Sequence, residues 1–263
     1  MILTLDIGNT QIFGGVYSED ELVFQFRKYS KQQFSSDEMG IFLVNVLEHN
    51  DIDPGNIEKI SICSVVPQIN YHIRNACIKY FNLDPFFLKP GVKTGLKIKY
   101  RNPQEVGADR ISNAIAGINL FPDRNLIIID FGTATTFCVI SKEKEYLGGI
   151  ILPGLYISME ALERNAAQLP KVEIIELQSV IGRSTTESIQ SGLYFGQLGM
   201  IKELKQRITK EAFKDDPPLI IGTGGFSSLY QNAGIFDEVI PALVLQGLVL
   251  AVNLNSSGEG KEK

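Results

Sequence analysis

Two short stretches decide the fold of this sequence: MILTLDIGNT (residues 1–10) and LIIIDFGTATT (residues 126–136). Each is an apolar run that ends at an aspartate, followed by a glycine and by short hydroxyl or amide side chains. This pattern predicts a buried strand and then a tight turn. A shift of 124 positions, the separation of Asp6 and Asp130, also places Gly8 on Gly132 and Phe13 on Phe137. Two copies are too few for a solenoid, so the repeat predicts two related α/β domains.

The segments around these stretches predict the same kind of unit twice. In the first half, the patterns predict strands at 1–5, 12–17, 22–26 and 60–66, a helix at 35–50 with a capping box from Ser35 to Glu38, and a helix that opens at Pro67. In the second half, they predict strands at 126–129, 137–140, 147–152 and 219–221 and helices near 185–213 and 242–253. We therefore expect domains at 1–117 and 118–255 and a flexible tail at 256–263.

The residue counts restrict the chemistry that this chain can perform. Its 263 residues include two histidines and three cysteines, and no pair has the spacing of a zinc site or a disulfide scaffold. Unpaired cysteines are typical of a reducing cytoplasm, so we expect a cytoplasmic protein. A net charge of −5 disfavours nucleic-acid binding. The sequence also predicts no signal peptide and no membrane span.

The two aspartate–glycine turns are candidates for a phosphate site. Paired turns of this kind can hold a polyphosphate between them, while the aspartates recruit a cation. Each turn alone could equally be an ordinary tight turn with a local acceptor, but two in a duplicated frame favour the phosphate site. A third turn at residues 222–225 fits neither the dinucleotide fingerprint nor the Walker A pattern. It is either a simple turn or the place where the adenosine of a nucleotide binds.

Five further motifs complete a resemblance to a known family. These motifs are GADR at 107–110, Gly148-Gly149, Pro153-Gly154, IGRST at 181–185 and QSG at 190–192. They add to the turns at Asp6–Thr10 and Asp130–Thr136. From Met1 to about Asn253 the chain resembles the type III pantothenate kinases of the acetate kinase, sugar kinase, Hsp70 and actin superfamily. The resemblance implies two duplicated ribonuclease H-like domains with a nucleotide cleft between them. It also implies ATP-dependent phosphorylation of pantothenate to 4'-phosphopantothenate, the first step of coenzyme A biosynthesis, by a homodimer.

The resemblance assigns roles on the pantothenate side. Asp109 is the implied general base that accepts the hydroxyl proton, although the same residue could simply be a helix-start carboxylate bonded to backbone amides. The other residues implied to bind pantothenate are Gly107, Ala108, Arg110, Tyr100 and Thr185. By themselves, Tyr100 would be a strand aromatic and Thr185 a helix N-cap.

The resemblance also assigns roles on the ATP side. It implies that Asp6 acts on the phosphates through Mg²⁺ and its waters, and that Asp130 holds a monovalent cation, K⁺ or NH₄⁺. Further residues are implied to contact ATP: Ile7, Gly8, Asn9, Thr10, Gln11, Ile12, Phe13 and Thr133. Gly224, from the third glycine-rich turn, completes this set.

Two alternatives to pantothenate phosphorylation stay open on the sequence. One is a different small-molecule kinase of the same superfamily, for example for an amino sugar, or a phosphatase that uses the same turns. The other is a non-enzymatic transcriptional accessory factor with the nucleotide turns as a switch. The acidic charge balance gives this second alternative no support for direct DNA contact.

Overall fold

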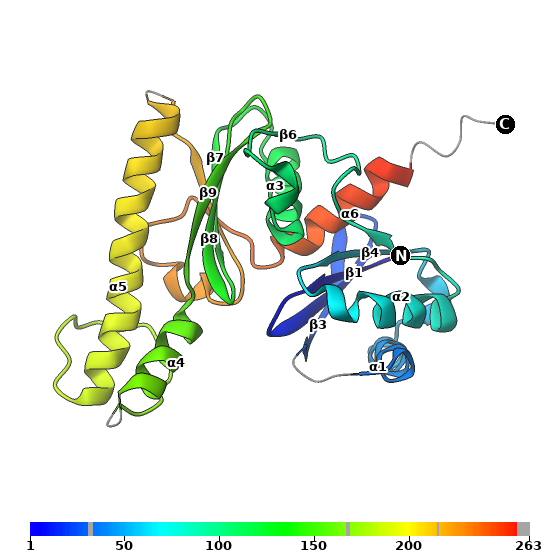
Figure 1. Cartoon of the computed structure of the whole chain (residues 1–263), viewed down its shortest axis with the longest axis horizontal. Helices are drawn as coiled ribbons and strands as arrows, with labels where there is room; N and C mark the ends of the chain where they lie inside the picture. Colours follow the sequence, from blue (N-terminus) through cyan, green and yellow to red (C-terminus); the bar gives the residue numbers. More distant parts are fainter. Residues whose placement is uncertain (31–33, 167–168, 215, 257–263) are drawn as a thin grey trace. The chain divides into compact units, whose positions relative to one another are not determined.

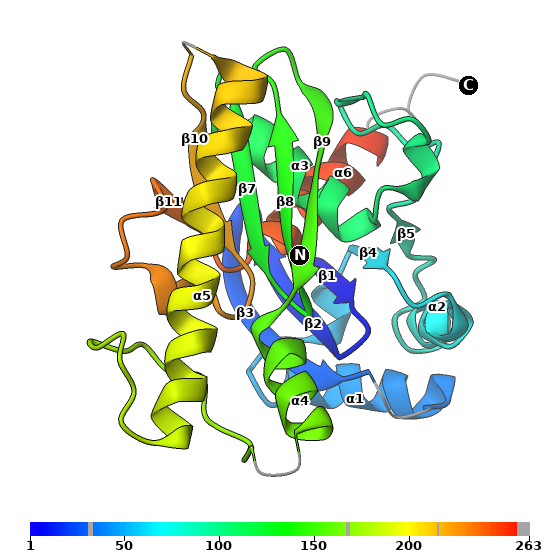
Figure 2. The ribbon, with the colours of Figure 1, turned by 60° about the vertical axis from the view of Figure 1, so that its left-hand side comes forward.

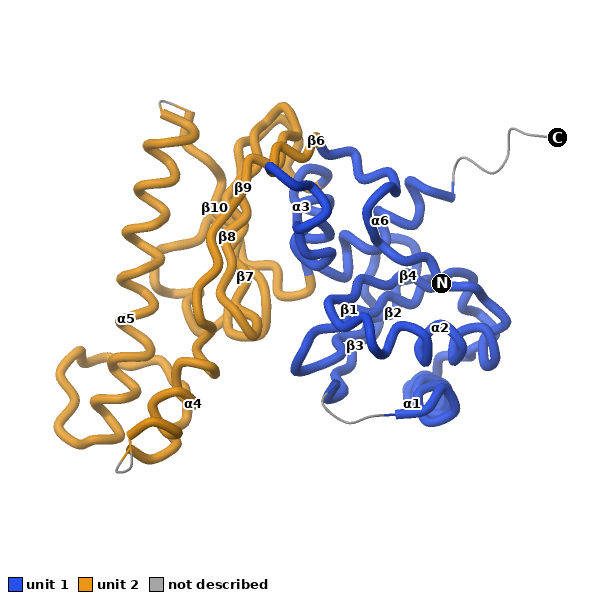
Figure 3. The backbone as a smooth tube through the Cα atoms, viewed as in Figure 1, with its two compact units in different colours: residues 1–96, 101–119, 243–263 blue, residues 97–100, 120–242 orange. Residues whose placement is uncertain are grey.

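The computed structural model describes residues 1–30, 34–166, 169–214 and 216–256. The chain divides into two compact units (Figure 3). Unit 1 contains residues 1–96, 101–119 and 243–263, and unit 2 contains residues 97–100 and 120–242.

Unit 1 is built on a five-stranded mixed sheet in the order β3-β2-β1-β4-β5. Strands β1 to β3 form the antiparallel meander, and β4 and β5 run parallel to β1. The strands are β1 (Ile2–Ile7), β2 (Gln11–Ser18), β3 (Glu21–Tyr29), β4 (Lys59–Ser64) and β5 (Phe86–Phe87).

One face of this sheet carries the core of unit 1. Leu3, Leu5 and Ile7 alternate along β1, are fully buried, and pack with α1 (Ser36–Glu48) and α2 (Pro67–Phe81). The two helices lie beside each other in Figure 1. The predicted capping box is present, because the Ser35 hydroxyl accepts from the Glu38 amide while the Glu38 carboxylate accepts from the Ser35 amide. Because successive residues of a strand face opposite sides of the sheet, the residues between Leu3, Leu5 and Ile7 on β1 face away from this core.

The opposite face is covered by α6 (Leu243–Ser256), the last helix of the chain. Ser61 Oγ of β4 donates to the Leu248 carbonyl at 2.8 Å. Ser112 Oγ of α3 (Ala108–Leu120) donates to the Val244 carbonyl at 2.7 Å. The apolar run near the C-terminus is thus a buried helix, as predicted, and it connects the sheet to α3.

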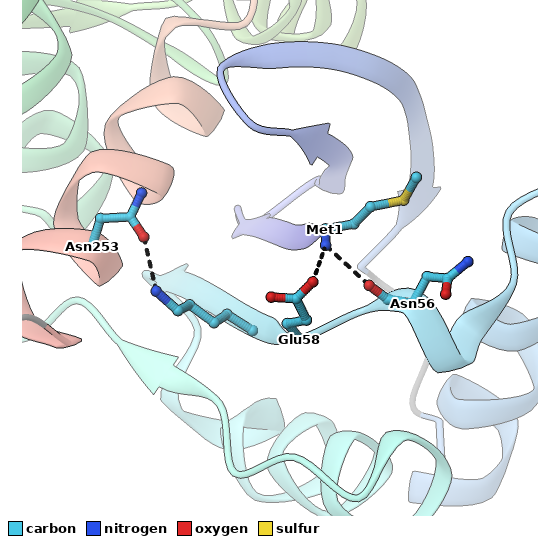
Figure 4. Close-up of polar contacts among 5 residues, drawn as sticks. Met1, Asn56, Glu58 and Asn253 are labelled. Carbon is cyan, nitrogen blue, oxygen red and sulfur yellow. Dashed lines mark hydrogen bonds and ion pairs between the residues drawn. The ribbon is translucent and has the colours of Figure 1, made fainter.

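The first residue of the chain is also held in unit 1 (Figure 4). The Met1 ammonium donates to the Asn56 carbonyl at 3.0 Å and to Glu58 Oε1 at 3.2 Å. Lys59 Nζ donates to Asn253 Oδ1 of α6 at 3.0 Å. These contacts join the beginnings of β1 and β4 to the covering helix.

Unit 2 repeats the strand order of unit 1. Its six-stranded sheet has the order β11-β10-β7-β8-β9-β6, so β9-β8-β7-β10-β11 corresponds to β3-β2-β1-β4-β5 in order and in direction. The strands are β6 (Lys97–Ile98), β7 (Leu126–Phe131), β8 (Ala134–Ile140), β9 (Glu145–Pro153), β10 (Leu219–Thr223) and β11 (Glu238–Val239). The duplication predicted from the sequence is confirmed.

Helices α4 (Leu155–Asn165) and α5 (Thr185–Ile208) pack on one face of this sheet, and α5 ends in a π-helical turn at Thr209–Phe213. Figure 2 shows α5 lying along β7 and β8. The buried rings of Tyr194, Tyr230 and Phe131 stack in sequence, with centroid distances of 5.1 and 5.2 Å. This core orders the strand that ends at the second aspartate–glycine turn.

The sequence patterns missed several elements. One of them is helix α4. The others are the short strands β5, β6 and β11, which were missed because two-residue strands carry no periodic signal. The predicted domains, 1–117 and 118–255, stay a prediction; the compact units group α6 with the N-terminal strands and residues 97–100 with unit 2. Of the predicted tail at 256–263, Ser256 ends α6 and the rest lies outside the described residues. No helix in the described part of the chain is long and apolar enough to cross a membrane.

Candidate active site

Asp6 lies at the carboxyl end of β1, on the face of the sheet opposite the core. Its neighbours in register are Phe13 on β2 and Cys63 on β4, and Phe13 in turn pairs with Arg27 on β3. Residues directly opposite each other on paired strands share a face. Cys63, Asp6, Phe13 and Arg27 therefore form one row across the sheet, which we call the Asp6 row.

The Arg27 side chain packs on the ring of Phe13, its neighbour in the Asp6 row. Its guanidinium lies 3.9 Å from the centroid of the Phe13 ring, within the range of a cation–π contact. The neighbouring residue, Lys28, instead approaches Phe34 and Phe42 on the core face. The positive charge of Arg27 thus belongs to the face that carries Asp6.

The turn after Asp6 is tied to the strands around it. The Gly8 amide donates to the Gln11 carbonyl at 3.0 Å, and a Cβ on Gly8 would lie 3.1 Å from that oxygen. Ser30 closes the turn from β3: its hydroxyl donates to the Gly8 carbonyl at 2.6 Å and its amide donates to the Thr10 carbonyl at 3.0 Å. The turn is therefore held by contacts within unit 1.

Two residues of the predicted ATP segment cannot face a ligand with their side chains. Ile7 and Ile12 are fully buried in the core of unit 1. The Ile7 carbonyl already accepts from the Val65 amide at 3.0 Å. Only the backbone of these two positions is available to a nucleotide, whereas Asn9 is exposed at the tip of the turn.

The GADR segment opens α3. Gly107 accepts from the Ile111 amide at 3.1 Å, and Asp109 Oδ1 accepts from the Arg110 amide at 2.8 Å. A Cβ at Gly107 would come within 2.5 Å of Asp109 Oδ1, so a glycine lets the carboxylate fold back over the helix start. Asp109 thus accepts a backbone hydrogen bond at the helix start, as the structural interpretation of this residue predicts. A chemical role is compatible with this bond, because it uses only Oδ1 of the carboxylate.

Burial raises the pKa of Asp109 above its ordinary value, and the Arg110 amide and guanidinium partly oppose this effect. Burial also raises the pKa of the Cys63 thiol well above its ordinary value, and the charges of Asp6 and Asp109 raise it further. The charges of both predicted aspartates of unit 1 therefore act on the pKa of this one buried thiol.

In unit 2, the turns that contain Gly132 and Gly224 lie against the Asp130 carboxylate, and Gly154 packs on the first of these turns. The Gly132 amide donates to the Ala134 carbonyl at 3.1 Å. Gly224 has a φ of +86°, and a Cβ there would overlap Asp130 Oδ1. A Cβ at Gly154 would lie 2.7 Å from the Gly132 carbonyl oxygen. The backbone thus approaches the Asp130 carboxylate closely from two directions, and Thr133 is exposed on the turn.

The remaining predicted residues of unit 2 lie at element ends. Tyr100 follows β6, is half-buried, and packs edge-on against Tyr146 with a centroid distance of 6.4 Å. Thr185 is the exposed first residue of α5, whereas the N-cap is Ser184, whose hydroxyl accepts from the Glu187 amide. The interpretation of Thr185 as an N-cap is therefore wrong by one residue, because the Ser184 backbone is the extended one.

These positions fit the expected ions to different degrees. In the described ranges, no three His, Cys, Asp or Glu side chains gather into a metal cluster. Mg²⁺ needs none, since it commonly binds through one or two carboxylates, waters and substrate phosphates. Asp6 fits this mode. Asp130 fits a monovalent cation by its charge, and the Gly132 and Gly224 backbones lie close to its carboxylate.

Sequence reasoning missed three residues near Asp6: Cys63, Arg27 and Ser30. None belongs to a motif. Cys63 and Arg27 are recognisable only once strand register is known, and Ser30 only once the turn contacts are known.

The repeated 3-2-1-4-5 sheet with an aspartate–glycine turn after its central strand defines the acetate kinase, sugar kinase, Hsp70 and actin fold class. Among solved structures, a Campylobacter jejuni protein described as of the Baf family of transcriptional activators has a TM-score of 0.61 at 20% identity, covering 97% of this chain and 99% of that one. The activator of 2-hydroxyisocaproyl-CoA dehydratase from Clostridium difficile has a TM-score of 0.51 at 11% identity, covering 100% and 98%.

The sequence relatives narrow this class to one family. The family model described as type III pantothenate kinase matches residues 2–207. A type III pantothenate kinase of Legionella pneumophila (strain Corby) is 60% identical over 257 residues, which are 98% of this chain and 100% of the relative. The chain belongs to the type III pantothenate kinase family.

Proposed function

We propose that this protein transfers the γ-phosphoryl group of ATP to the primary hydroxyl of pantothenate, giving 4'-phosphopantothenate at the first step of coenzyme A biosynthesis. The observation that carries the proposal is the placement of two family-motif aspartates in unit 1: Asp6 at the end of β1, and Asp109 in the first turn of α3 with Oδ1 accepting from the Arg110 amide. Phosphoryl transfer is mostly positioning and charge neutralisation, with a carboxylate that accepts the hydroxyl proton.

Asp109 acts as the general base in this proposal. Its carboxylate accepts the proton of the pantothenate hydroxyl while the oxygen attacks the γ-phosphorus. The raised pKa of Asp109 brings its basicity closer to that of the group it deprotonates, which favours general-base catalysis. Arg110, which is only 6% exposed, and the Gly107 and Ala108 backbone bind pantothenate beside it. Tyr100 and Thr185 of unit 2 are also proposed to bind pantothenate.

Asp6 and the turn after it bind the ATP phosphates. The turn amides other than that of Gly8, together with the Thr10 and Asn9 side chains, are the proposed donors, and the positive charge of Arg27 lies on the same face. Bound Mg²⁺, held by Asp6 through water, would neutralise phosphate charge. Thr133 and Gly224 are proposed to contact ATP from unit 2, and Asp130 is proposed to hold K⁺ or NH₄⁺.

The protein is proposed to act as a cytoplasmic homodimer. Unit 2 exposes several large apolar side chains, and exposed apolar surface commonly marks an interface. Ile151 on β9 is 64% exposed, and Tyr156, Ile157 and Leu162 on α4 are 40 to 44% exposed. Sedimentation velocity of the purified protein should give a mass near twice the 29.1 kDa of the chain.

A coupled ADP-release assay tests the activity. ADP release should require pantothenate and Mg²⁺, and should be much faster in K⁺ or NH₄⁺ than in Na⁺. An amino-sugar panel is the control for the alternative kinase activity. Turnover with an amino sugar but not with pantothenate would overturn the proposed substrate, and turnover independent of K⁺ would remove the proposed role of Asp130.

A further inference from the structure

Cys63 makes a contact that the proposed mechanism does not use. It lies near the end of β4, is completely buried, and pairs in register with Asp6 of β1. Its Sγ donates to Asp6 Oδ1 at 3.2 Å, a normal distance for a sulfur donor. Because β1 and β4 are adjacent parallel strands, this contact is set by the sheet itself and not by a flexible loop.

The thiol donor restrains the Asp6 side chain from the neighbouring strand. Asp6 is the last polar residue of a strand whose neighbours, Leu5 and Ile7, point into the core. A hydrogen bond to Oδ1 selects one rotamer and directs the second carboxylate oxygen away from the thiol. A neutral donor does this without cancelling the negative charge, which a lysine or arginine at position 63 would do.

We propose that Cys63 is a positioning residue that holds the Asp6 carboxylate for the water shell of Mg²⁺–ATP. This inference rests on the proposed function, because it gives Asp6 the Mg²⁺ role stated there. Cys63 itself contacts neither phosphate nor metal. Its effect passes through Asp6, so its loss should weaken the Mg²⁺-dependent part of ATP binding and leave pantothenate binding unchanged.

Three variants separate positioning from packing. Cys63→Ala removes the donor, Cys63→Ser keeps a donor at the same place, and Cys63→Val fills the volume without a donor. Cys77→Ala is the matched control, because Cys77 is also fully buried in unit 1 but lies on α2 within the core. Both alanine variants should lower the melting temperature by creating a small cavity.

The readout is equilibrium binding of ATP measured with and without Mg²⁺, together with steady-state kinetics. In Cys63→Ala and Cys63→Val, the ATP affinity in Mg²⁺ should fall about three- to tenfold, the size expected for one lost hydrogen bond. The affinity without Mg²⁺ and the KM for pantothenate should not change. Cys63→Ser should stay within about twofold of the natural protein, and Cys77→Ala should keep the full Mg²⁺ effect.

Equal Mg²⁺ effects in Cys63→Ala and Cys77→Ala would overturn the positioning role, and so would a Cys63→Ser variant as impaired as Cys63→Val. The binding measurement also separates this inference from the proposed function. If the natural protein binds Mg²⁺–ATP but does not phosphorylate pantothenate, the proposed substrate fails while the Cys63 inference is still decided by the binding data.

Discussion

Asp109 shows the conflict between stability and chemistry at a single residue. A carboxylate that is held at a helix start and partly removed from water is less stable when charged than the same group in the unfolded chain. The direction of its pKa shift records this cost. A residue used only for structure would be better served by an asparagine, which keeps the Oδ1 acceptor for the Arg110 amide.

Asp109→Asn should therefore abolish turnover without lowering stability at neutral pH. We expect kcat to fall by about 10² or more, as for loss of a general base, while ATP binding persists. The folded pKa of Asp109 is raised, so its stabilising contribution exists below the unfolded pKa and is lost as pH rises through the folded pKa. The stability of the variant relative to the natural protein should accordingly increase from acid to neutral pH.

Urea unfolding across this pH range measures the effect. Asp84→Asn is the control, because the Arg74 hydrogen bond lowers the pKa of Asp84. The stability of Asp84→Asn relative to the natural protein should fall from acid to neutral pH, opposite to Asp109→Asn. The change should be small, since the Arg74–Asp84 pair is on the surface. Unchanged turnover in Asp109→Asn would remove Asp109 from the role of base.

The charge of Arg27 gives a second prediction at this scale. Arg27→Gln should raise the KM for ATP several-fold, and the effect should shrink in high salt because screening weakens the interaction of a surface charge with phosphates. Lys28→Gln is a matched control from the same strand, because Lys28 lies on the core face. Equal effects of the two substitutions would indicate only a general loss of charge.

At the scale of elements, the turns depend on backbone geometry that particular glycines permit. Gly224 adopts a φ of +86° and approaches Asp130 so closely that a methyl group does not fit. The corresponding turn of unit 1 is held differently, by Ser30, which donates to the Gly8 carbonyl. The two aspartate–glycine turns are therefore equivalent in sequence but stabilised by different partners.

Gly224→Ala should destabilise the protein by about 1–2 kcal/mol, because an alanine with positive φ is strained. It should also displace the Asp130 carboxylate and reduce the rate difference between K⁺ and Na⁺. Gly225→Ala is the control, since a Cβ at Gly225 has nothing within 4 Å. Thermal melts and the ADP-release assay in both salts measure the two effects, and full K⁺ activation in Gly224→Ala would contradict the role of this turn.

At the scale of the whole molecule, unit 1 is assembled from three separate segments of the chain. The last of them, α6, covers the sheet face that carries the Asp6 row and contacts α3, which begins with the GADR segment. A Cβ at Gly247 of α6 would overlap the Ser112 carbonyl oxygen of α3. The start of α3 thus depends on residues more than a hundred positions later in the sequence.

Gly247→Ala should separate α6 from α3 and reduce the free energy of unfolding by about 1–3 kcal/mol, the range found for overpacked cores. Because α3 carries Asp109, kcat should fall as well. Gly192→Ala on α5 is the matched helical control: a Cβ there meets nothing within 4 Å, so this substitution should stabilise the helix by up to about 1 kcal/mol. Denaturant unfolding and kinetics test both, and a neutral Gly247→Ala would contradict the packing described.

The sequence by itself determined the duplication, the strands that end at Asp6 and Asp130, and the candidate motifs. These signals are local: an apolar run, an aspartate and a glycine lie within ten residues, and the same signal recurs at a constant separation. The capping box of α1 was predictable for the same reason.

Only the tertiary structure decided which side chains share the face of Asp6. Cys63 and Arg27 reach that face through strand register, and α6 reaches unit 1 through packing against residues far away in sequence. Register and helix docking depend on contacts between segments that are distant along the chain, and no local pattern of Cys63, Arg27 or Gly247 contains that information.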